Sequence, residues 1–205
     1  MTRAHRVPAP PYERATRTMR LFLAVEFEPR VRRSLREATA PLRAIIPDAG
    51  WVAEDRLHLT LKFLDDQPET LVPPLTAALG EIARRHWPVP IRLRGVGAFP
   101  NLRRPRVVWV GIAPTPKLEL LQHDVEEGCA ALGVEVEGKP FRPHLTIGRL
   151  RGTEGRDAVR ELARAARSIR LRADTLVSSI ELMHSTLTPS GPRYVRLGDA
   201  PLRSE

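Results

Sequence analysis

Cysteine is almost missing from this sequence of 205 residues. Cys129 is the single example, so the chain cannot form an intramolecular disulfide, which is typical of proteins of the reducing cytoplasm. Long apolar runs are missing too, and none approaches the roughly 18 uncharged residues that a membrane span needs. The basic N-terminus is followed by no apolar run of the kind that marks a secretory signal. We therefore expect a cytoplasmic protein without a membrane segment.

Lysine is the second scarce residue, although the chain is strongly basic. The formal net charge is +9, and of the 33 basic residues only three are lysines, Lys62, Lys117 and Lys139. Arginine supplies the rest, and its planar guanidinium suits phosphate better than the point charge of lysine does. The charge permits a nucleic-acid partner without establishing one, because an arginine bias also arises from genome composition.

Two kinds of motif are absent as well. No glycine-rich phosphate loop is present, so no ATP site is predicted. Two histidines, His58 and His144, could bind zinc, but the sequence has no third or fourth ligand at a diagnostic spacing from them. We therefore expect neither a cofactor nor a metal.

The chain divides into a basic leader and one folded region. Residues 1–18 hold four arginines and three prolines with hardly any apolar periodicity, which predicts disorder; a basic arm that contacts RNA is the alternative. Over residues 19–205 we predict a single domain. Apolar periodicity indicates helices near 29–45, 70–86, 116–132 and 156–167, with Pro41 kinking or shortening the first. Strands are expected near 20–26, 56–64, 89–97, 106–112 and 141–150, and two or three more between 169 and 197.

The order of these elements repeats along the chain. Arg20 precedes His58 by 38 residues, and Arg106 precedes His144 by the same 38. Two matched units of about 80 residues indicate an internal duplication. We predict an α+β fold of two pseudo-symmetric lobes, each a mainly antiparallel sheet with helices on its outer face, with the active-site cleft between them.

A short motif, His-Leu-Thr, stands at the same place in both units, at residues 58–60 and 144–146. Alternate residues of a strand face the same side, so His58 shares a face with Thr60, and His144 shares one with Thr146. At ordinary composition a histidine is followed by Leu-Thr about once in a hundred or more cases. Two occurrences at matched positions therefore argue against chance, and we expect the two pairs to converge on one small anionic group.

Such a set of side chains suits the cleavage of a phosphodiester. The nucleophile must lose a proton and the leaving oxygen must gain one, and two imidazoles with pKa values near neutrality can do both. Threonine hydroxyls can donate hydrogen bonds to the non-bridging oxygens, and no metal is needed. The competing interpretation makes each histidine a half-buried structural residue; the repetition favours catalysis.

At these residues the chain resembles the 2H phosphoesterases, and among them the RNA 2′,3′-cyclic phosphodiesterases once called 2′-5′ RNA ligases (LigT/ThpR-like). The likeness covers nearly all of residues 19–197. Where the family often has a glycine after Lys-Phe-Leu, this chain has Asp65, which puts the geometry of the adjoining loop in doubt. Besides the two motifs, the segments that carry the likeness are Arg20–Val25, Trp51-Val52, Gly97–Pro100, Arg106–Gly111, Phe141–Arg149, Ser185 and Gly191–Tyr194.

The resemblance implies hydrolysis of RNA with 2′,3′-cyclic phosphate ends, tRNA fragments included, to a 2′-phosphomonoester, together with reversible 2′-5′ ligation. It implies that His58 is the proton donor to the departing 3′ oxygen and that His144 is the proton acceptor that activates water. Internal symmetry leaves the reversed assignment open. The residues implied to hold the phosphate are Thr60, Thr146 and Arg149.

Arg149 fits this role on one structural condition. Strict alternation places it on the face opposite His144, so Gly148 must mark a bulge or the end of the strand. Lys62 shares the face of His58 by alternation and is interpreted as either a phosphate contact or a solvated residue, while Phe63 falls on the core face. Aromatic side chains that could stack on a terminal RNA base are Phe99, Phe141 and Tyr194.

Two further hypotheses stay open at this point. One is another 2H reaction, on small cyclic nucleotide phosphates or 2′-5′ linkages. The other is a module that binds RNA ends without turnover, although such a module need not keep two matched acid–base groups. In each case we expect a monomer.

Overall fold

The computed structural model describes residues 17–188 and 191–204. The predicted leader, residues 1–18, lies outside the described residues except for its last two. Thr18 is already the first residue of a strand, so the folded region begins one residue earlier than expected. Within the described ranges, no helix combines the length and apolar character that a membrane crossing requires.

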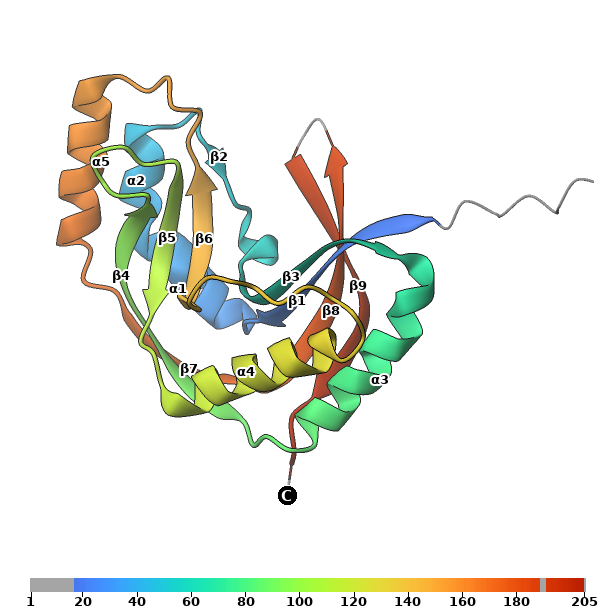
Figure 1. The fold of residues 1–205 in the computed structure, drawn as a ribbon. Helices are drawn as coiled ribbons and strands as arrows, with labels where there is room; N and C mark the ends of the chain where they lie inside the picture. Colours follow the sequence, from blue (N-terminus) through green and yellow to red (C-terminus); the bar gives the residue numbers. More distant parts are fainter. Residues whose placement is uncertain (1–16, 189–190, 205) are drawn as a thin grey trace, which may run out of the picture.

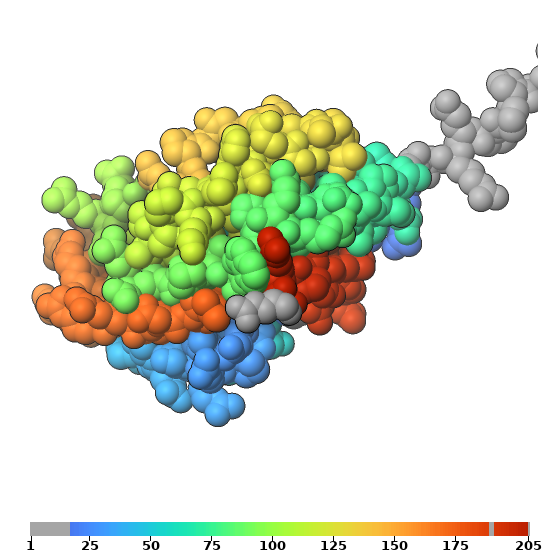
Figure 2. Space-filling model, turned by 90° about the horizontal axis from the view of Figure 1, so that it is seen from below, coloured from blue at the N-terminus to red at the C-terminus, as the bar shows by residue number. Residues whose placement is uncertain are grey.

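One antiparallel sheet has the strand order β3-β1-β8-β9 and lies on the right of Figure 1. Its strands are β1 (Thr18–Glu26), β3 (His58–Pro68), β8 (Ser179–Thr188) and β9 (Gly191–Pro201). Helix α3 (Val72–Ala83) packs on β8 and β9, and helix α4 (Pro116–Ala130) packs on α3 and β3. Seen from below, α3 and α4 lie side by side across the middle of the molecule (Figure 2).

The second antiparallel sheet, on the left of Figure 1, has the order β2-β6-β5-β4-β7. Helix α5 packs on β4, and α2 packs on α5. The elements of this lobe are α1 (Pro29–Ala38), α2 (Ala40–Ile45), β2 (Gly50–Trp51), β4 (Val89–Phe99), β5 (Val107–Ile112), β6 (His144–Arg149), α5 (Arg156–Ser168) and β7 (Arg172–Val177). Two short 3₁₀ helices, η1 (Glu54–Arg56) and η2 (Glu69–Leu71), flank β3.

Prolines and caps explain where the helices begin. A proline stands in the first turn of α1, α2, α3 and α4, where its missing N–H is not needed. The hydroxyl of Thr115 also accepts a hydrogen bond from the Leu118 N–H at 3.2 Å, capping α4. The kink expected at Pro41 is a break: α1 ends at Ala38, and α2 starts at Ala40.

The predicted fold class is confirmed: the fold is α+β, with two antiparallel sheets and helices against them. The division of the chain between the sheets is less simple than two consecutive units. Strand β4, from the first unit, joins the sheet of β5 and β6, whereas β8 and β9 return to the sheet of β1 and β3. Each sheet therefore contains strands from both ends of the folded region.

Strand β1 is covered on both of its faces. Leu21, Leu23 and Val25 belong to the main core, while Phe22 and Ala24 form a small separate cluster with Met183, against which Tyr194 packs. Because alternate residues of a strand face opposite sides, the small cluster marks the face of the four-stranded sheet that is turned away from the main core. This second face carries the histidine of the first motif, as the ring contacts below show.

Candidate active site

The two motif strands, β3 and β6, come from different sheets and contact each other. His58 and His144 are the first residues of these strands, and both side chains are half-buried. They are close enough for the charge of His144 to contribute to lowering the pKa of His58. The structure therefore brings together the two histidines that the sequence singled out.

Both histidines are held in the same way. The Nδ1 atom of His58 lies 2.8 Å from the carbonyl oxygen of Arg56, and that of His144 lies 2.6 Å from the carbonyl oxygen of Arg142. A carbonyl oxygen only accepts hydrogen bonds, so Nδ1 must be the protonated nitrogen in each neutral ring. In both residues Nε2 is thereby left as the atom that can gain or lose a proton.

A β-bulge follows each motif at the same position. Ala24 pairs with Thr60 but Leu23 pairs with Lys62, so Leu61 is the extra residue in β3. Likewise Trp109 pairs with Thr146 but Val108 pairs with Gly148, so Ile147 is the extra residue in β6. A bulge reverses the alternation of faces beyond it, so the pattern that holds up to each threonine fails immediately afterwards.

The second bulge meets the structural condition on Arg149. Beyond Ile147, Gly148 is buried and Arg149 is exposed, and the guanidinium charge acts on His144, His58 and Tyr194. A Cβ atom on Gly148 would lie 2.4 Å from the ring of Trp51. Only glycine therefore lets the Trp51 ring, from the neighbouring strand β2, pack against this position of β6.

The first bulge shows that the expectation for Lys62 is wrong. Lys62 does not share the face of His58: its side chain is only 1% exposed, forms an ion pair with Glu126, and donates a hydrogen bond to the Glu135 carbonyl oxygen at 2.8 Å. The core position expected for Phe63 is wrong for the same reason. Phe63 is 55% exposed, with its ring centroid 6.1 Å from that of Phe22.

Aromatic rings surround both imidazoles. Tyr194 and Phe22 lie 5.3 and 5.1 Å from His58 between ring centroids, and Phe99 lies 5.0 Å from His144. Trp109 is 6.3 Å from His144. Phe141 instead lines a neighbouring hollow, together with Trp109 and Arg142.

Sequence reasoning missed Phe22 and Trp109; only Phe22 carried a usable signal in the sequence, because the place of Trp109 depends on strand pairing. Phe22 alternates with the core residues Leu21 and Leu23, which places it on the opposite face. Trp109 pairs directly with Thr146.

The hydroxyls of Thr60 and Thr146 complete the set. Both residues are half-buried, and each precedes its bulge, so each keeps the face of its histidine. No hydrogen bond joins either hydroxyl to another group in the described part of the chain. Both hydroxyls are thus free to donate to an anionic group bound between the motifs.

Burial and positive charge both act against protonation of the histidines. Desolvation is the main cause that lowers the pKa of His58 and of His144 below the usual 6.5, and the charge of Arg149 lowers both further. The carbonyl oxygens of Arg56 and Arg142 oppose this shift in part. At His58 the Glu26 carboxylate also favours the protonated form.

Comparison with known proteins identifies the family of this chain. A family model described as the 2′-5′ RNA ligase superfamily matches residues 27–185. The chain belongs to this superfamily. That membership confirms the resemblance that the paired motifs predicted, and the matched region contains both of them.

Two curated relatives of this chain share one name. A Methanothermobacter thermautotrophicus protein is 32% identical over 86% of this chain and 95% of its own length. A Thermus thermophilus protein is 36% identical over 91% of this chain and 92% of its own length. Each is called RNA 2′,3′-cyclic phosphodiesterase.

Two solved structures have a similar fold. A Thermus thermophilus protein superposes with a TM-score of 0.75 at 31% identity, over 91% of this chain and 100% of that one. E. coli LigT in complex with 3′-AMP superposes with a TM-score of 0.70 at 26% identity, over 92% of this chain and 100% of that one.

The effect of the Arg149 charge on the two histidines can be tested through the pH dependence of the activity. In Arg149→Gln, loss of a nearby cation raises the pKa of both histidines, so the pH–rate profile should move to higher pH. In addition kcat should fall by about 10²–10³-fold if the guanidinium stabilises the transition state. The control Arg149→Lys keeps the charge and should keep the position of the profile. An unmoved profile in Arg149→Gln would show that Arg149 does not act on the histidines.

Proposed function

We propose that this protein hydrolyses the terminal 2′,3′-cyclic phosphate of RNA to a 2′-phosphomonoester by two-histidine acid–base catalysis without a metal. The observation that carries the proposal is the shared Nδ1 anchoring of His58 and His144, which leaves two Nε2 atoms for proton transfer. The name shared by relatives that align with most of this chain supports the same substrate.

In the proposed step, water attacks phosphorus and one imidazole takes its proton. The bond from phosphorus to the 3′ oxygen breaks, and the other imidazole donates a proton to that oxygen. Thr60, Thr146 and Arg149 bind the non-bridging oxygens, where negative charge increases in the transition state. The product is a 2′-phosphomonoester with a free 3′-hydroxyl, and each histidine ends in the protonation state in which the other began.

His58 is proposed as the proton donor and His144 as the acceptor. The Glu26 carboxylate contributes to holding a proton on His58, and no carboxylate contributes in this way to the pKa of His144 among the described residues. A donor must start protonated and an acceptor neutral, so the Glu26 contribution favours this assignment, while desolvation lowers the pKa of both histidines.

The same residues support a ligation reaction. If the 5′-hydroxyl of a second RNA replaces water, the same bond to the 3′ oxygen breaks and a 2′-5′ phosphodiester forms. Reversal of this reaction cleaves a 2′-5′ linkage. We place the enzyme in the cytoplasm as a monomer, acting on RNA fragments such as those of tRNA; the single cysteine supports that compartment.

A chelation experiment tests the function directly. An RNA oligonucleotide with a 2′,3′-cyclic phosphate end is incubated with the protein in EDTA, and the product is separated from synthetic 2′- and 3′-phosphate standards. We expect a 2′-phosphate, formed at the same rate with and without EDTA.

Each alternative predicts a different result of this experiment. Loss of activity on chelation would overturn the metal-free mechanism, and a 3′-phosphate would mean that the other ester bond breaks. Turnover of nucleoside 2′,3′-cyclic phosphates alone would indicate a small-molecule 2H enzyme. Binding without turnover would indicate an RNA-end-binding module.

A further inference from the structure

We propose that an arginine-lined groove between residues 100–106 and helix α5 binds the sugar-phosphate backbone of the RNA next to the reacting end. This inference rests on the proposed function, because it assumes that the polyanion in the groove is the same strand whose end reaches the histidines. It adds a second contact region outside the site described above, and it makes RNA longer than one nucleotide the preferred substrate.

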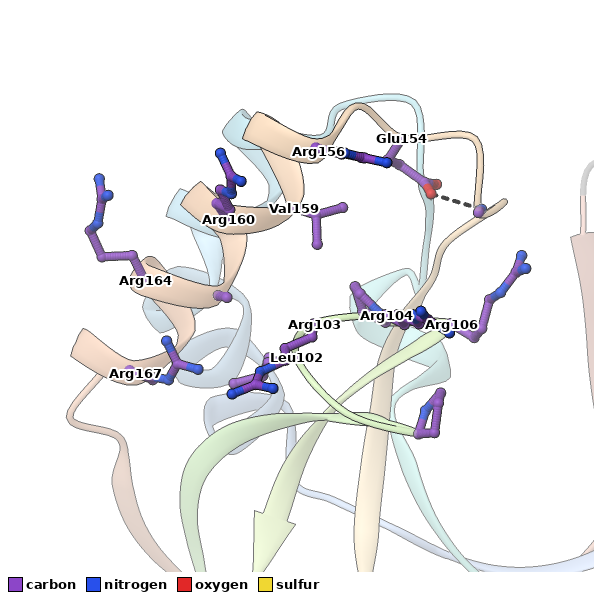
Figure 3. Close-up of a pocket in the computed structure, with 14 residues that line it drawn as sticks. Leu102, Arg103, Arg104, Arg106, Glu154, Arg156, Val159, Arg160, Arg164 and Arg167 are labelled. Carbon is purple, nitrogen blue, oxygen red and sulfur yellow. Dashed lines mark hydrogen bonds between the residues drawn. The ribbon is translucent and has the colours of Figure 1, made fainter.

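The groove has a volume of about 1100 Å³. Figure 3 shows arginines of the 100–106 segment on one side and arginines of α5 on the other. Glu154 is the only carboxylate among the lining residues, and its two oxygens accept hydrogen bonds from the backbone N–H groups of Arg151 and Gly152, each at 2.7 Å. The seven lining arginines are Arg103, Arg104, Arg106, Arg156, Arg160, Arg164 and Arg167.

Most of these charges have no protein partner. Arg160 forms an exposed ion pair with Asp157, and Arg106 donates a hydrogen bond to the Arg151 carbonyl oxygen at 2.8 Å. The other five make no ion pair with any residue of the described ranges, and all seven residues are exposed. Exposed guanidinium groups that surround a hollow and outnumber the nearby carboxylates are an electrostatic footprint of nucleic-acid backbone binding.

The arrangement on α5 is unfavourable for the helix by itself. Arg156, Arg160 and Arg164 follow one another at four-residue spacing, and like charges at this spacing lower helix stability. The opposite side of the helix is buried through Leu162 and Ala166, so packing determines which side the arginines occupy. A bound polyanion would remove the repulsion among them.

The groove is linked to the active-site strands through the backbone at the strand ends. The Arg106 N–H donates to the Phe99 carbonyl oxygen at 2.8 Å, and the Leu150 N–H donates to the Arg106 carbonyl oxygen at 2.9 Å. Phe99 is the ring that lies against His144, and Pro100, the next residue, already lines the groove. One wall of the groove therefore starts at the residue that follows Phe99 in the chain.

The length of β6 gives the scale of the proposed contact. His144 and Arg149 stand at opposite ends of this strand, which at 3.3 Å per residue separates their backbones by roughly 16 Å. No residue of β6 lines the groove, whereas Gly152 and Glu154, which follow the Arg149 end of this strand, do. A mononucleotide held at the histidines is too short to reach it, whereas an RNA strand would pass along β6 and place its next phosphates among the arginines.

The test compares long and short substrates in matched variants. Arg104→Gln/Arg164→Gln removes one unpaired charge from each wall of the groove. The control Arg33→Gln/Arg36→Gln removes two exposed charges from α1. Each variant is assayed with an oligonucleotide that ends in a 2′,3′-cyclic phosphate and with a nucleoside 2′,3′-cyclic phosphate. Circular dichroism melting shows whether each variant is folded.

The groove variant should raise KM for the oligonucleotide roughly 20-fold at 0.1 M salt, and it should lower the slope of log affinity against log salt by about 1.4, or about 0.7 for each lost phosphate contact. Its kcat should stay unchanged, as should KM for the nucleoside cyclic phosphate. The control should leave both substrates unaffected. Equal losses in both variants, or an unchanged oligonucleotide KM in the groove variant, would overturn the proposal.

A binding measurement separates this proposal from the proposed function. Affinity for the oligonucleotide is measured by fluorescence anisotropy in the His144→Ala background, with and without the groove substitutions, so no turnover is needed. If wild-type protein hydrolyses neither substrate, the proposed function is wrong, and the binding experiment still decides whether the groove holds RNA. If RNA binds equally well with and without Arg104 and Arg164, the groove proposal is wrong whatever the activity.

Discussion

Replacing His58 or His144 by alanine is expected to lower kcat by about 10²–10⁴-fold, because each substitution removes one of the two proton-transfer groups. The fold should survive, since both side chains are half-buried and lie outside the main core. KM should stay close to the wild-type value, because the phosphate would still bind through Thr60, Thr146 and Arg149. Steady-state kinetics on the cyclic-phosphate oligonucleotide, with thermal unfolding as a check, measure these effects.

The comparison with other histidines makes this prediction specific. His123 is exposed on α4 and outside the site, so His123→Ala should retain wild-type activity. The double variant lacking both His58 and His144 should be little worse than either single variant, because residues that act as one unit give non-additive losses. Near-full activity in either single variant would rule out the two-histidine mechanism.

Replacing Lys62 by methionine is expected to destabilise the protein by about 3–5 kcal/mol, because it leaves the Glu126 carboxylate buried without its cation. Glu126 would retain two hydrogen bonds, from the Glu137 N–H at 2.7 Å and from the Gln122 side chain at 3.3 Å. It would lose the ion pair that joins α4 to β3. Urea unfolding measures the change in free energy.

Two further variants show whether the pair itself is responsible. Lys62→Met/Glu126→Leu removes both charges and should recover most of the lost stability, since an apolar pair of similar volume can replace a buried ion pair. Lys117 lies exposed in the first turn of α4, and Lys117→Met should change the free energy of unfolding by no more than about 0.5 kcal/mol. A stable Lys62→Met protein would mean that the ion pair contributes little.

The ion pair also bears on the site through the chain that follows α4. Lys62 and Glu126 hydrogen-bond to the backbone of Glu135 and Glu137, in the segment that leads to Phe141 and His144. A lysine that the motif suggested as a phosphate contact thus fastens the connection between α4 and the second motif strand. If Lys62→Met lowers activity, a matching loss of stability should accompany it.

Local sequence patterns were sufficient for much of this protein. The repeated His-Leu-Thr motif identified both histidines and both threonines, because side-chain alternation within three residues does not depend on the rest of the fold. Apolar periodicity located the principal helices and strands to within a few residues. The 38-residue spacing before each motif indicated paired lobes, and the bulge at matching positions in β3 and β6 supports the proposed duplication.

Other features required the tertiary structure. A bulge depends on how a strand pairs with its neighbour, so strand alternation assigned Lys62 and Phe63 to the wrong faces and left the position of Arg149 conditional. The exchange of β4, β8 and β9 between the sheets likewise depends on pairing between distant segments. The arginine groove combines two segments that are some fifty residues apart in the chain. Sequence by itself therefore determined the His-Leu-Thr pairs and the elements that carry them, whereas only long-range packing decided which other side chains surround the two motifs.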